Sequence, residues 1–195
     1  MEETGMTVFL ETERMVLRRF TENDDGLLFG LDADPEVMRY LTGGRPTPRE
    51  EVRERILPAM LGWYERCTDR GFWAAQTREG GFLGWFHLRE PTGADPGEPE
   101  LGYRLRRSAW GRGYATEGSR ALVSAAFSDP SVRRVFARTM AVNAGSRRVM
   151  EKAGMRLVRT FNEGGHPIPG SEHGDVEYAI TRAEWEKAYQ PALGR

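Results

Sequence analysis

The stretch that decides the fold reads Trp110-Gly111-Arg112-Gly113-Tyr114-Ala115-Thr116-Glu117. Before it, Leu101, Tyr103 and Leu105 alternate with other residues as in a strand, and after it an alanine-rich run favours a helix. The first N–H groups of a helix lack partners within the helix, and the helix dipole favours negative charge there. Because glycines let the backbone approach a ligand, the turn predicts a site for a phosphate-bearing anion. An ordinary strand-to-helix turn with two glycines has the same pattern.

Two familiar phosphate-binding motifs are excluded at this turn. A dinucleotide-binding turn needs G-x-G-x-x-G, but Thr116 stands where the third glycine would be. A P-loop needs G-K followed by Ser or Thr, and that sequence is missing as well. The turn alone therefore does not identify the phosphate compound.

Strand and helix patterns alternate on both sides of the turn, which predicts a mixed α/β (α+β) sheet. Glu79-Gly80-Gly81 is a hairpin signal between two strands, and Gly154 is a C-terminal helix cap. Strands are expected at residues 15–20, 72–77, 82–89, 99–106, 134–140, 155–161 and 175–181, and helices at 21–33, 35–41, 114–127, 144–153 and 183–189.

A further helix is expected after Thr47-Pro48-Arg49-Glu50, which has the pattern of a capping box with proline at the first helical position. Pro58 should kink this helix because proline lacks the N–H that a helix interior needs. Its apolar stripe at helical spacing consists of Val52, Ile56, Met60, Trp63 and Cys67.

Length and composition predict one domain over residues 1–195, with residues 1–11 as a candidate flexible N-terminus. Apolar residues make up 39% and charged residues 29%, as in a soluble globular chain. There is one cysteine, and neither a signal peptide nor an apolar run long enough to span a bilayer. These features predict a cytoplasmic protein without membrane partners.

Charge is distributed unevenly along the chain. Residues 1–100 carry 20 acidic and 12 basic residues, whereas residues 101–195 carry 9 acidic and 16 basic ones. A basic half favours an anionic ligand, either a phosphate-bearing cofactor or a nucleic acid, but a solvated arginine-rich surface explains it equally well. His87, His166 and His173 lack metal-ligand spacing, so no metal is expected.

The run from Asn143 to Met155, Asn-Ala-Gly-Ser-Arg-Arg-Val-Met-Glu-Lys-Ala-Gly-Met, resembles the N-x-x-S…E-K-x-G-[FM] block of the GNAT superfamily. More narrowly, it resembles the ribosomal-protein N-terminal acetyltransferase (Rim-type) branch, in which this block follows a W-G-x-G-Y-A-T-E turn. Glu100-Leu101-Gly102-Tyr103 and the opening Thr12-Glu13-Arg14-Met15-Val16-Leu17-Arg18 are similar to that branch too. The resemblance covers residues 12–185.

The resemblance implies a GNAT fold, with a mostly antiparallel mixed sheet that splays open between its fourth and fifth strands and holds acetyl-CoA as cosubstrate. It also assigns cofactor-binding roles. The backbone from Tyr103 to Leu105 would bind the pantetheine and polarise the thioester, and Asn143 and Ser146 would contact the pantetheine near the sulfur. The pyrophosphate would be bound by Gly111, Arg112, Gly113, Tyr114, Ala115 and Thr116, and the candidates for further phosphate contacts are Arg107, Arg112, Arg147 and Arg148.

Acetyl transfer to an amine needs a base for the amine proton and benefits from an acid for the leaving thiolate. Glu100 is the base candidate, with a solvent-facing strand glutamate as the alternative, and His87 is a second candidate with a structural alternative. Many GNAT members have a tyrosine acid where this chain has Met150, and a thioether cannot donate a proton. The acid role then falls to Ser146 or to no residue.

The function expected from this resemblance is transfer of an acetyl group from acetyl-CoA to a primary amine, by direct attack in a ternary complex. The acceptor would be a small amine or a peptide or protein N-terminus, and the enzyme a monomer or homodimer. Its acceptor site would be built by the N-terminal helices, the turn Gly43-Gly44-Arg45 and residues 162–174. The alternatives are a non-catalytic acyl-CoA-binding sensor and, ranked last, a nucleic-acid binder that uses the basic residues between 101 and 160.

Overall fold

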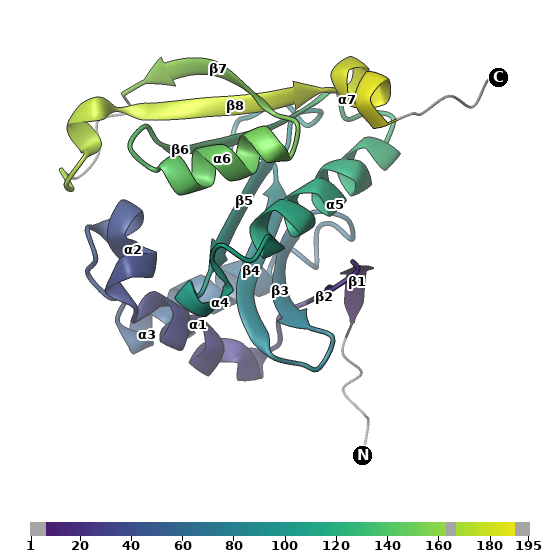
Figure 1. Cartoon of the computed structure of the whole chain (residues 1–195). Coiled ribbons are helices and arrows are strands. Elements are labelled where there is room, and N and C mark those ends of the chain that lie inside the picture. The colour runs from purple at the N-terminus through teal and green to yellow at the C-terminus, as the bar shows by residue number, and fades with distance from the viewer. Residues whose placement is uncertain (1–6, 163–166, 190–195) are drawn as a thin grey trace. The chain divides into compact units, whose positions relative to one another are not determined.

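The computed structural model describes residues 7–162 and 167–189 (Figure 1). Its strands are β1 (Val8–Glu11), β2 (Met15–Arg18), β3 (Gly71–Thr77), β4 (Phe82–Arg89), β5 (Glu100–Leu105), β6 (Arg134–Met140), β7 (Arg156–Phe161) and β8 (Asp175–Thr181). Over the described ranges these strands form one sheet in the order β1-β2-β3-β4-β5-β6-β8-β7.

The sheet is mixed and mostly antiparallel. The pairs β1–β2, β2–β3, β6–β8 and β7–β8 are antiparallel, and β5 and β6 are parallel. The register of β5 on β6 consists of one pair, Glu100 with Phe136, whereas β6 and β8 pair along seven residues. The ladder between β5 and β6, the fourth and fifth strands of the sequence analysis, is therefore much shorter than the ladder between β6 and β8.

The helical segments are mostly short, and no helix in the described residues is both long and apolar enough to cross a membrane. The α-helices are α1 (Asp25–Asp32), α2 (Pro35–Thr42), α3 (Arg49–Glu51), α4 (Leu57–Leu61), α5 (Tyr114–Ser128), α6 (Ala144–Lys152) and α7 (Arg182–Tyr189). Between them lie the 3-10 turns η1 (Glu22–Asp24), η3 (Arg107–Ala109) and η4 (Ser171–His173), and the π-helical segment η2 (Val52–Ile56).

Two compact units make up the chain. The first comprises residues 1–87 and 103–118, and the second residues 88–102 and 119–195. The chain passes between them within β4, within β5 and within α5.

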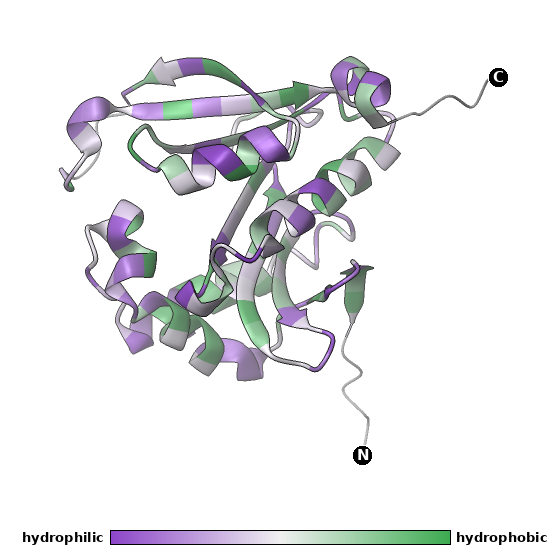
Figure 2. Cartoon of the chain, in the orientation of Figure 1, coloured by the Kyte–Doolittle hydropathy of each residue, from purple (hydrophilic) through white to green (hydrophobic). Residues whose placement is uncertain are grey.

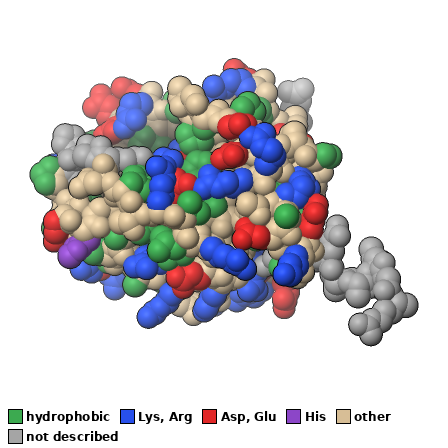
Figure 3. Space-filling model, turned by 90° about the horizontal axis from the view of Figure 1, so that it is seen from above, with side chains coloured by type: hydrophobic (Ala, Val, Ile, Leu, Met, Phe, Trp, Pro, Cys, Tyr) green, Lys and Arg blue, Asp and Glu red, His purple; other side chains and the backbone are tan. Residues whose placement is uncertain are grey.

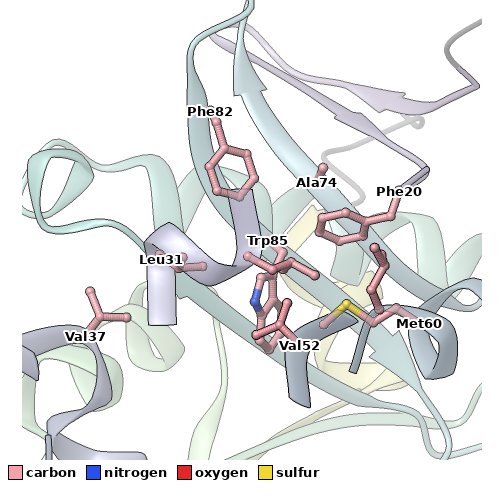
Figure 4. Packing of buried hydrophobic residues seen from close by; sticks show 10 residues of the cluster. Phe20, Leu31, Val37, Val52, Met60, Ala74, Phe82 and Trp85 are labelled. Carbon is pink, nitrogen blue, oxygen red and sulfur yellow. The ribbon is translucent and has the colours of Figure 1, made fainter. Parts of the chain in front are cut away.

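The first unit has an apolar core beneath its N-terminal helices. Figure 4 shows Trp85 of β4 among Leu31, Val52 and Met60, with Phe82 and Phe20 nearby. The same unit holds a buried ion pair, Arg18 with Asp24 at 2.7 Å, and a second pair between half-buried Arg104 and buried Asp32 at 2.5 Å.

The helix expected from residue 49 to 67 differs from its prediction in two ways. The expected cap is wrong, because the Thr47 hydroxyl donates to Asp32 at 3.2 Å and the helix has no side-chain cap. The helix also passes through the π segment η2, which ends two residues before Pro58, and it ends at Leu61. A wider π turn accommodates the proline, which lacks an N–H. Because the helix ends at Leu61, Trp63 and Cys67 lie beyond it, and both are only half-buried.

In the second unit, α6 packs against β6 and β8. Figure 2 shows hydrophilic and hydrophobic residues on α6, as expected for a helix with one face on a sheet. Glu177 of β8 is buried and accepts hydrogen bonds from Arg134, Arg138 and Arg159. Burial raises the pKa of Glu177, but these three guanidinium groups outweigh burial and lower the pKa to about 2.

The basic excess of the second half does not form one continuous positive surface on the face shown in Figure 3, where Lys and Arg side chains are interspersed with acidic ones. Several of these arginines are in ion pairs, including Arg133 with Asp95 and Arg134 with Glu98.

The remaining expected strands and helices are confirmed, with ends that differ by at most four residues. One strand was missed: residues 8–11, assigned to a candidate flexible N-terminus, form β1 and pair with β2. Residues 1–6 lie outside the described part.

Candidate functional site

The C-terminal end of β5 is fixed closely against β4. A Cβ atom on Gly84 would lie 2.1 Å from the backbone oxygen of Arg104, so only glycine allows this approach of the two strands. The Arg106 N–H donates to Leu83 O at 2.9 Å. Because successive N–H groups of a strand point to opposite sides, the N–H groups of Leu105 and Tyr103 point away from β4.

Trp110 connects this strand end to the glycine-rich turn. Its indole Nε1 donates to Leu105 O at 2.7 Å, while 47% of the residue remains exposed. The sequence analysis assigned no separate role to the Trp110 side chain. The hydrogen bond shows that the indole ties the turn to the last residue of β5.

The turn has the backbone geometry of an anion site. Gly111 and Gly113 have φ values of 70° and 85°, which favour glycine. The first hydrogen bond of α5 runs from Glu117 N–H to Gly113 O at 3.0 Å. The N–H groups of residues 114–116 precede that bond, so they have no acceptor within the helix and are placed to bind an anion.

The first turn of α5 packs directly on β4. A Cβ atom on Gly118 would lie 2.4 Å from the ring of Phe86, so this glycine allows the close packing. The Phe86 ring also contacts the ring of Tyr103, with 5.8 Å between centroids. The helix start and the end of β5 are therefore held on one strand.

Glu117 is the acidic residue of this first helical turn, and its carboxylate is paired with residues of the segment between β1 and β2. Its carboxylate accepts hydrogen bonds from the Thr12 hydroxyl at 2.6 Å and from the Arg14 side chain at 2.6 Å. Burial raises the pKa of Glu117, but these hydrogen bonds outweigh burial and leave the pKa below its usual value. The sequence analysis missed Arg14, although it lies in the opening stretch that resembles the Rim-type branch.

In the second unit, Asn143 caps α6. Its Oδ1 accepts from the Ser146 N–H at 3.1 Å, and its Nδ2 donates to the Thr139 hydroxyl at 3.0 Å. Ser146 is half-buried in the first turn of α6, and Met150 is buried one turn later. Asn143 and Ser146 thus lie together at the start of one helix, as expected.

Arg147 was a candidate for phosphate binding, but its side chain is engaged within the second unit. It donates to the Tyr178 hydroxyl at 3.1 Å and to Ala141 O at 3.0 Å, and the Tyr178 hydroxyl donates to Glu151. The neighbouring Arg148 is exposed. These contacts hold α6 against β8.

The two base candidates have different surroundings. Glu100 begins β5 and is half-buried, and Arg89 of β4 donates to its carboxylate at 3.2 Å. His87 is only 8% exposed and packs against the rings of Trp85 and Phe72 at 5.7 and 5.1 Å. The burial of His87 among aromatic rings favours the structural interpretation.

The structure brings the expected residues together in two groups. Tyr103, Leu105 and the turn 111–116 belong to the first unit, and Glu100, Asn143 and Ser146 to the second. Within the described ranges there is no cluster of three or more side chains suited to a metal ion. His166 and part of the expected acceptor loop, residues 163–166, lie outside those ranges.

Comparison of the sequence with known families and proteins identifies close relatives. The acetyltransferase (GNAT) domain matches residues 14–156. The FsC-acetyl coenzyme A-N(2)-transacetylase of Aspergillus fumigatus is 35% identical over 197 residues, which covers 95% of this chain and 81% of that protein. The uncharacterized protein YkkB of Bacillus subtilis is 32% identical and covers 82% of this chain and 91% of its own length.

Solved structures with this fold include enzymes bound to coenzyme A. The aminoglycoside acetyltransferase AAC(6')-Ib in complex with coenzyme A matches with a TM-score of 0.70 and 26% identity, over 89% of this chain and 98% of that one. RimL, the ribosomal L7/L12 α-N-protein acetyltransferase, matches in fold with a TM-score of 0.74 and 18% identity, over 89% and 97% of the two chains.

Proposed function

Since the chain belongs to the GNAT acetyltransferase family and is an acetyl-CoA-dependent N-acetyltransferase, we propose that it acetylates a primary amine by direct attack in a ternary complex. The observation that carries this proposal is the glycine-rich turn, where the N–H groups of residues 114–116 stand ahead of the first hydrogen bond of α5.

The turn binds the pyrophosphate of acetyl-CoA through these backbone N–H groups and those of residues 111–113. Arg112 is exposed and adds positive charge next to them. Charge-assisted hydrogen bonds to phosphate are stronger than neutral ones, so a backbone site of this kind supplies much of the affinity. The N–H groups of Tyr103 and Leu105, which point away from β4, bind the pantetheine and polarise the thioester carbonyl.

In the reaction, the neutral amine nitrogen attacks the thioester carbon, and the carbonyl oxygen becomes an oxyanion that the Leu105 N–H stabilises. Glu100 takes the proton that the amine loses. The C–S bond then breaks and coenzyme A leaves as a thiolate. A thiolate of pKa about 8.5 leaves without strong acid assistance, and it takes a proton from Ser146 through water or from solvent.

Relatives suggest the acceptor class. The name of the Aspergillus fumigatus relative describes acetylation at a nitrogen, AAC(6')-Ib is an aminoglycoside acetyltransferase and RimL is a protein N-acetyltransferase. Their common substrate feature is an amine, and we assign a primary amine of a small molecule or of a peptide N-terminus to this enzyme.

A thiol-release assay tests the function. The protein is supplied with acetyl-CoA and, separately, with N-terminal peptides, polyamines and aminoglycosides, and free coenzyme A thiol is measured. At least one amine should release thiol and gain an acetyl group by mass spectrometry. Binding of acetyl-CoA without thiol release across the whole panel would instead support the sensor function, which the missing tyrosine at Met150 also fits.

A further inference from the structure

Two segments more than 100 residues apart in sequence meet at one carboxylate. Glu117 of α5 accepts hydrogen bonds from the Thr12 hydroxyl at 2.6 Å, the Arg14 backbone N–H at 2.9 Å and the Arg14 Nε at 2.6 Å. The turn between β1 and β2 is therefore attached to the first turn of α5. Both segments belong to the first unit.

Arg14 also contacts the glycine-rich turn itself. Its NH1 donates to Arg112 O at 2.9 Å, and its guanidinium lies over the Tyr114 ring at 4.6 Å from the centroid. A trans peptide unit is planar, and its C=O and N–H point in opposite directions. Because the carbonyl of Arg112 is directed at Arg14, the N–H of Gly113 points away from Arg14.

Arg14 also neutralises the negative charge of Glu117 in the first turn of α5. A carboxylate in the first turn of α5 would repel a pyrophosphate bound there. Arg14 pairs with Glu117 at 2.6 Å and neutralises this charge. The glycine at 113 suits this arrangement, since a Cβ atom there would lie 3.2 Å from the Arg14 guanidinium.

We propose that Arg14 and Glu117 are positioning residues for acetyl-CoA: together they fix the Gly113 N–H toward the pyrophosphate and remove the repulsion of the Glu117 carboxylate. The proposal rests on the proposed binding of pyrophosphate at the turn. We call this pair, Arg14 and Glu117, the clamp. Neither residue touches the reacting atoms, so the clamp acts on cosubstrate affinity and not on the chemical step.

The Glu117→Gln variant tests the clamp. Its amide keeps an oxygen for Thr12 but presents an NH2 group to the Arg14 guanidinium, so the ion pair and the fixed carbonyl of Arg112 are lost. Because glutamine has no charge to repel the pyrophosphate, a loss of affinity in this variant reports on the positioning of the Gly113 N–H alone. We expect the Kd and the KM for acetyl-CoA to rise about tenfold, the effect of losing one charge-assisted network, with kcat at saturating acetyl-CoA unchanged. Calorimetry gives Kd, and steady-state kinetics separates KM from kcat.

The Arg78→Gln variant is a matched control. Arg78 binds the same β1–β2 turn, through Glu13 O at 2.8 Å and Glu11 at 3.2 Å, and it is exposed to a similar degree as Arg14. None of its hydrogen bonds reaches residues 110–117. A role in stabilising the β1–β2 turn alone would make both variants behave alike, whereas the clamp predicts loss of affinity only for Glu117→Gln.

Arg14→Lys provides a second test if Glu117→Gln does not fold. A lysine keeps the charge but lacks the planar fork that reaches both Glu117 and the carbonyl of Arg112, so acetyl-CoA affinity should fall several-fold. Wild-type affinity in a folded variant, or a loss confined to kcat, overturns the clamp. Gly113→Ala separates this failure from failure of the proposed function: if that variant also binds acetyl-CoA normally, the turn is not the pyrophosphate site.

Discussion

The two units provide the expected site in different ways. The first unit offers backbone N–H groups, on β5 and at the turn 111–116. Two of its side chains, Arg14 and Trp110, hold this backbone in place by donating hydrogen bonds to Arg112 O and Leu105 O. The second unit offers side chains, namely Glu100, Asn143 and Ser146. Glu100 accepts a hydrogen bond from Arg89, and Asn143 donates one to Thr139. Substitutions in the first unit should therefore act on cosubstrate affinity, whereas those in the second should act on turnover or on both affinity and stability.

The largest expected effect comes from Glu100 in the second unit. Glu100→Gln removes the proposed base but keeps a hydrogen-bond acceptor for Arg89. We expect turnover to fall by ~100-fold, the lower range for a general base, while the affinity for acetyl-CoA stays at the wild-type value. Stopped assays of thiol release from pH 6 to 9 and calorimetry measure the two quantities.

Glu98→Gln is the control for Glu100→Gln, because Glu98 lies two residues earlier and pairs with Arg134 at 3.1 Å. It should leave turnover unchanged. Equal turnover of Glu100→Gln and wild type across the pH range would remove Glu100 from the mechanism and with it the division of roles between the units.

The next effect concerns Gly113 in the first unit. Gly113→Ala places a Cβ atom at a φ of 85° and 3.2 Å from Arg14, which should shift the turn and its N–H groups. Loss of one to two hydrogen bonds to a charged phosphate should weaken acetyl-CoA binding roughly 30-fold, with kcat at saturation near the wild-type value. Calorimetric titration with acetyl-CoA gives the affinity.

Gly154→Ala is the matched substitution in the second unit, at the end of α6, where φ is 90°. Both alanine variants carry similar backbone strain and should lose about 1 kcal/mol of stability. Only Gly113→Ala should lose affinity for acetyl-CoA. A similar loss of affinity in both variants would show that backbone strain alone explains the effect.

Local sequence signals were sufficient for most of the sheet and for the turn itself. Alternation predicted β5, and Gly154 predicted the end of α6, because both signals depend on neighbouring residues. β1 was not predicted, because a strand of four residues is too short to show an alternating pattern. The hydrogen bond of Thr47 to Asp32 was not predicted either, since a threonine before a helix has the same sequence pattern whether its hydroxyl caps the helix or makes a tertiary contact.

The candidate site shows the same limit. Gly111 and Gly113 could be found because a positive φ requires glycine, and Asn143 because it begins a helix. The hydrogen bonds of Arg14 to Glu117 join residues 103 positions apart, and no spacing rule connects them. The hydrogen bond from Arg147 to Tyr178 was not predicted for the same reason. In sequence, an arginine near a phosphate site cannot be distinguished from one on a packed helix.

Asn143 should show both affinity and stability effects. Asn143→Ala removes the cap of α6, which should cost about 1 kcal/mol of unfolding free energy, and it should also weaken acetyl-CoA binding. Asn143→Asp keeps an acceptor for the Ser146 N–H but loses the donor to Thr139. Thermal denaturation and calorimetry of both variants separate the cap from the contact with cosubstrate: if Asn143→Asp restores stability and affinity together, the residue acts only as a cap.

The smallest expected effect isolates a side chain of the second unit without disturbing its helix. In Ser146→Ala the backbone N–H still donates to Asn143, so α6 keeps its cap and the melting temperature should stay near that of the wild type. The hydroxyl is lost, and we expect kcat/KM for acetyl-CoA to fall several-fold, since a neutral hydrogen bond contributes about 1 kcal/mol. Wild-type kinetics would leave the thiolate to depart without any acid from the protein, which its pKa permits, and the second unit would then contribute to chemistry through Glu100 alone.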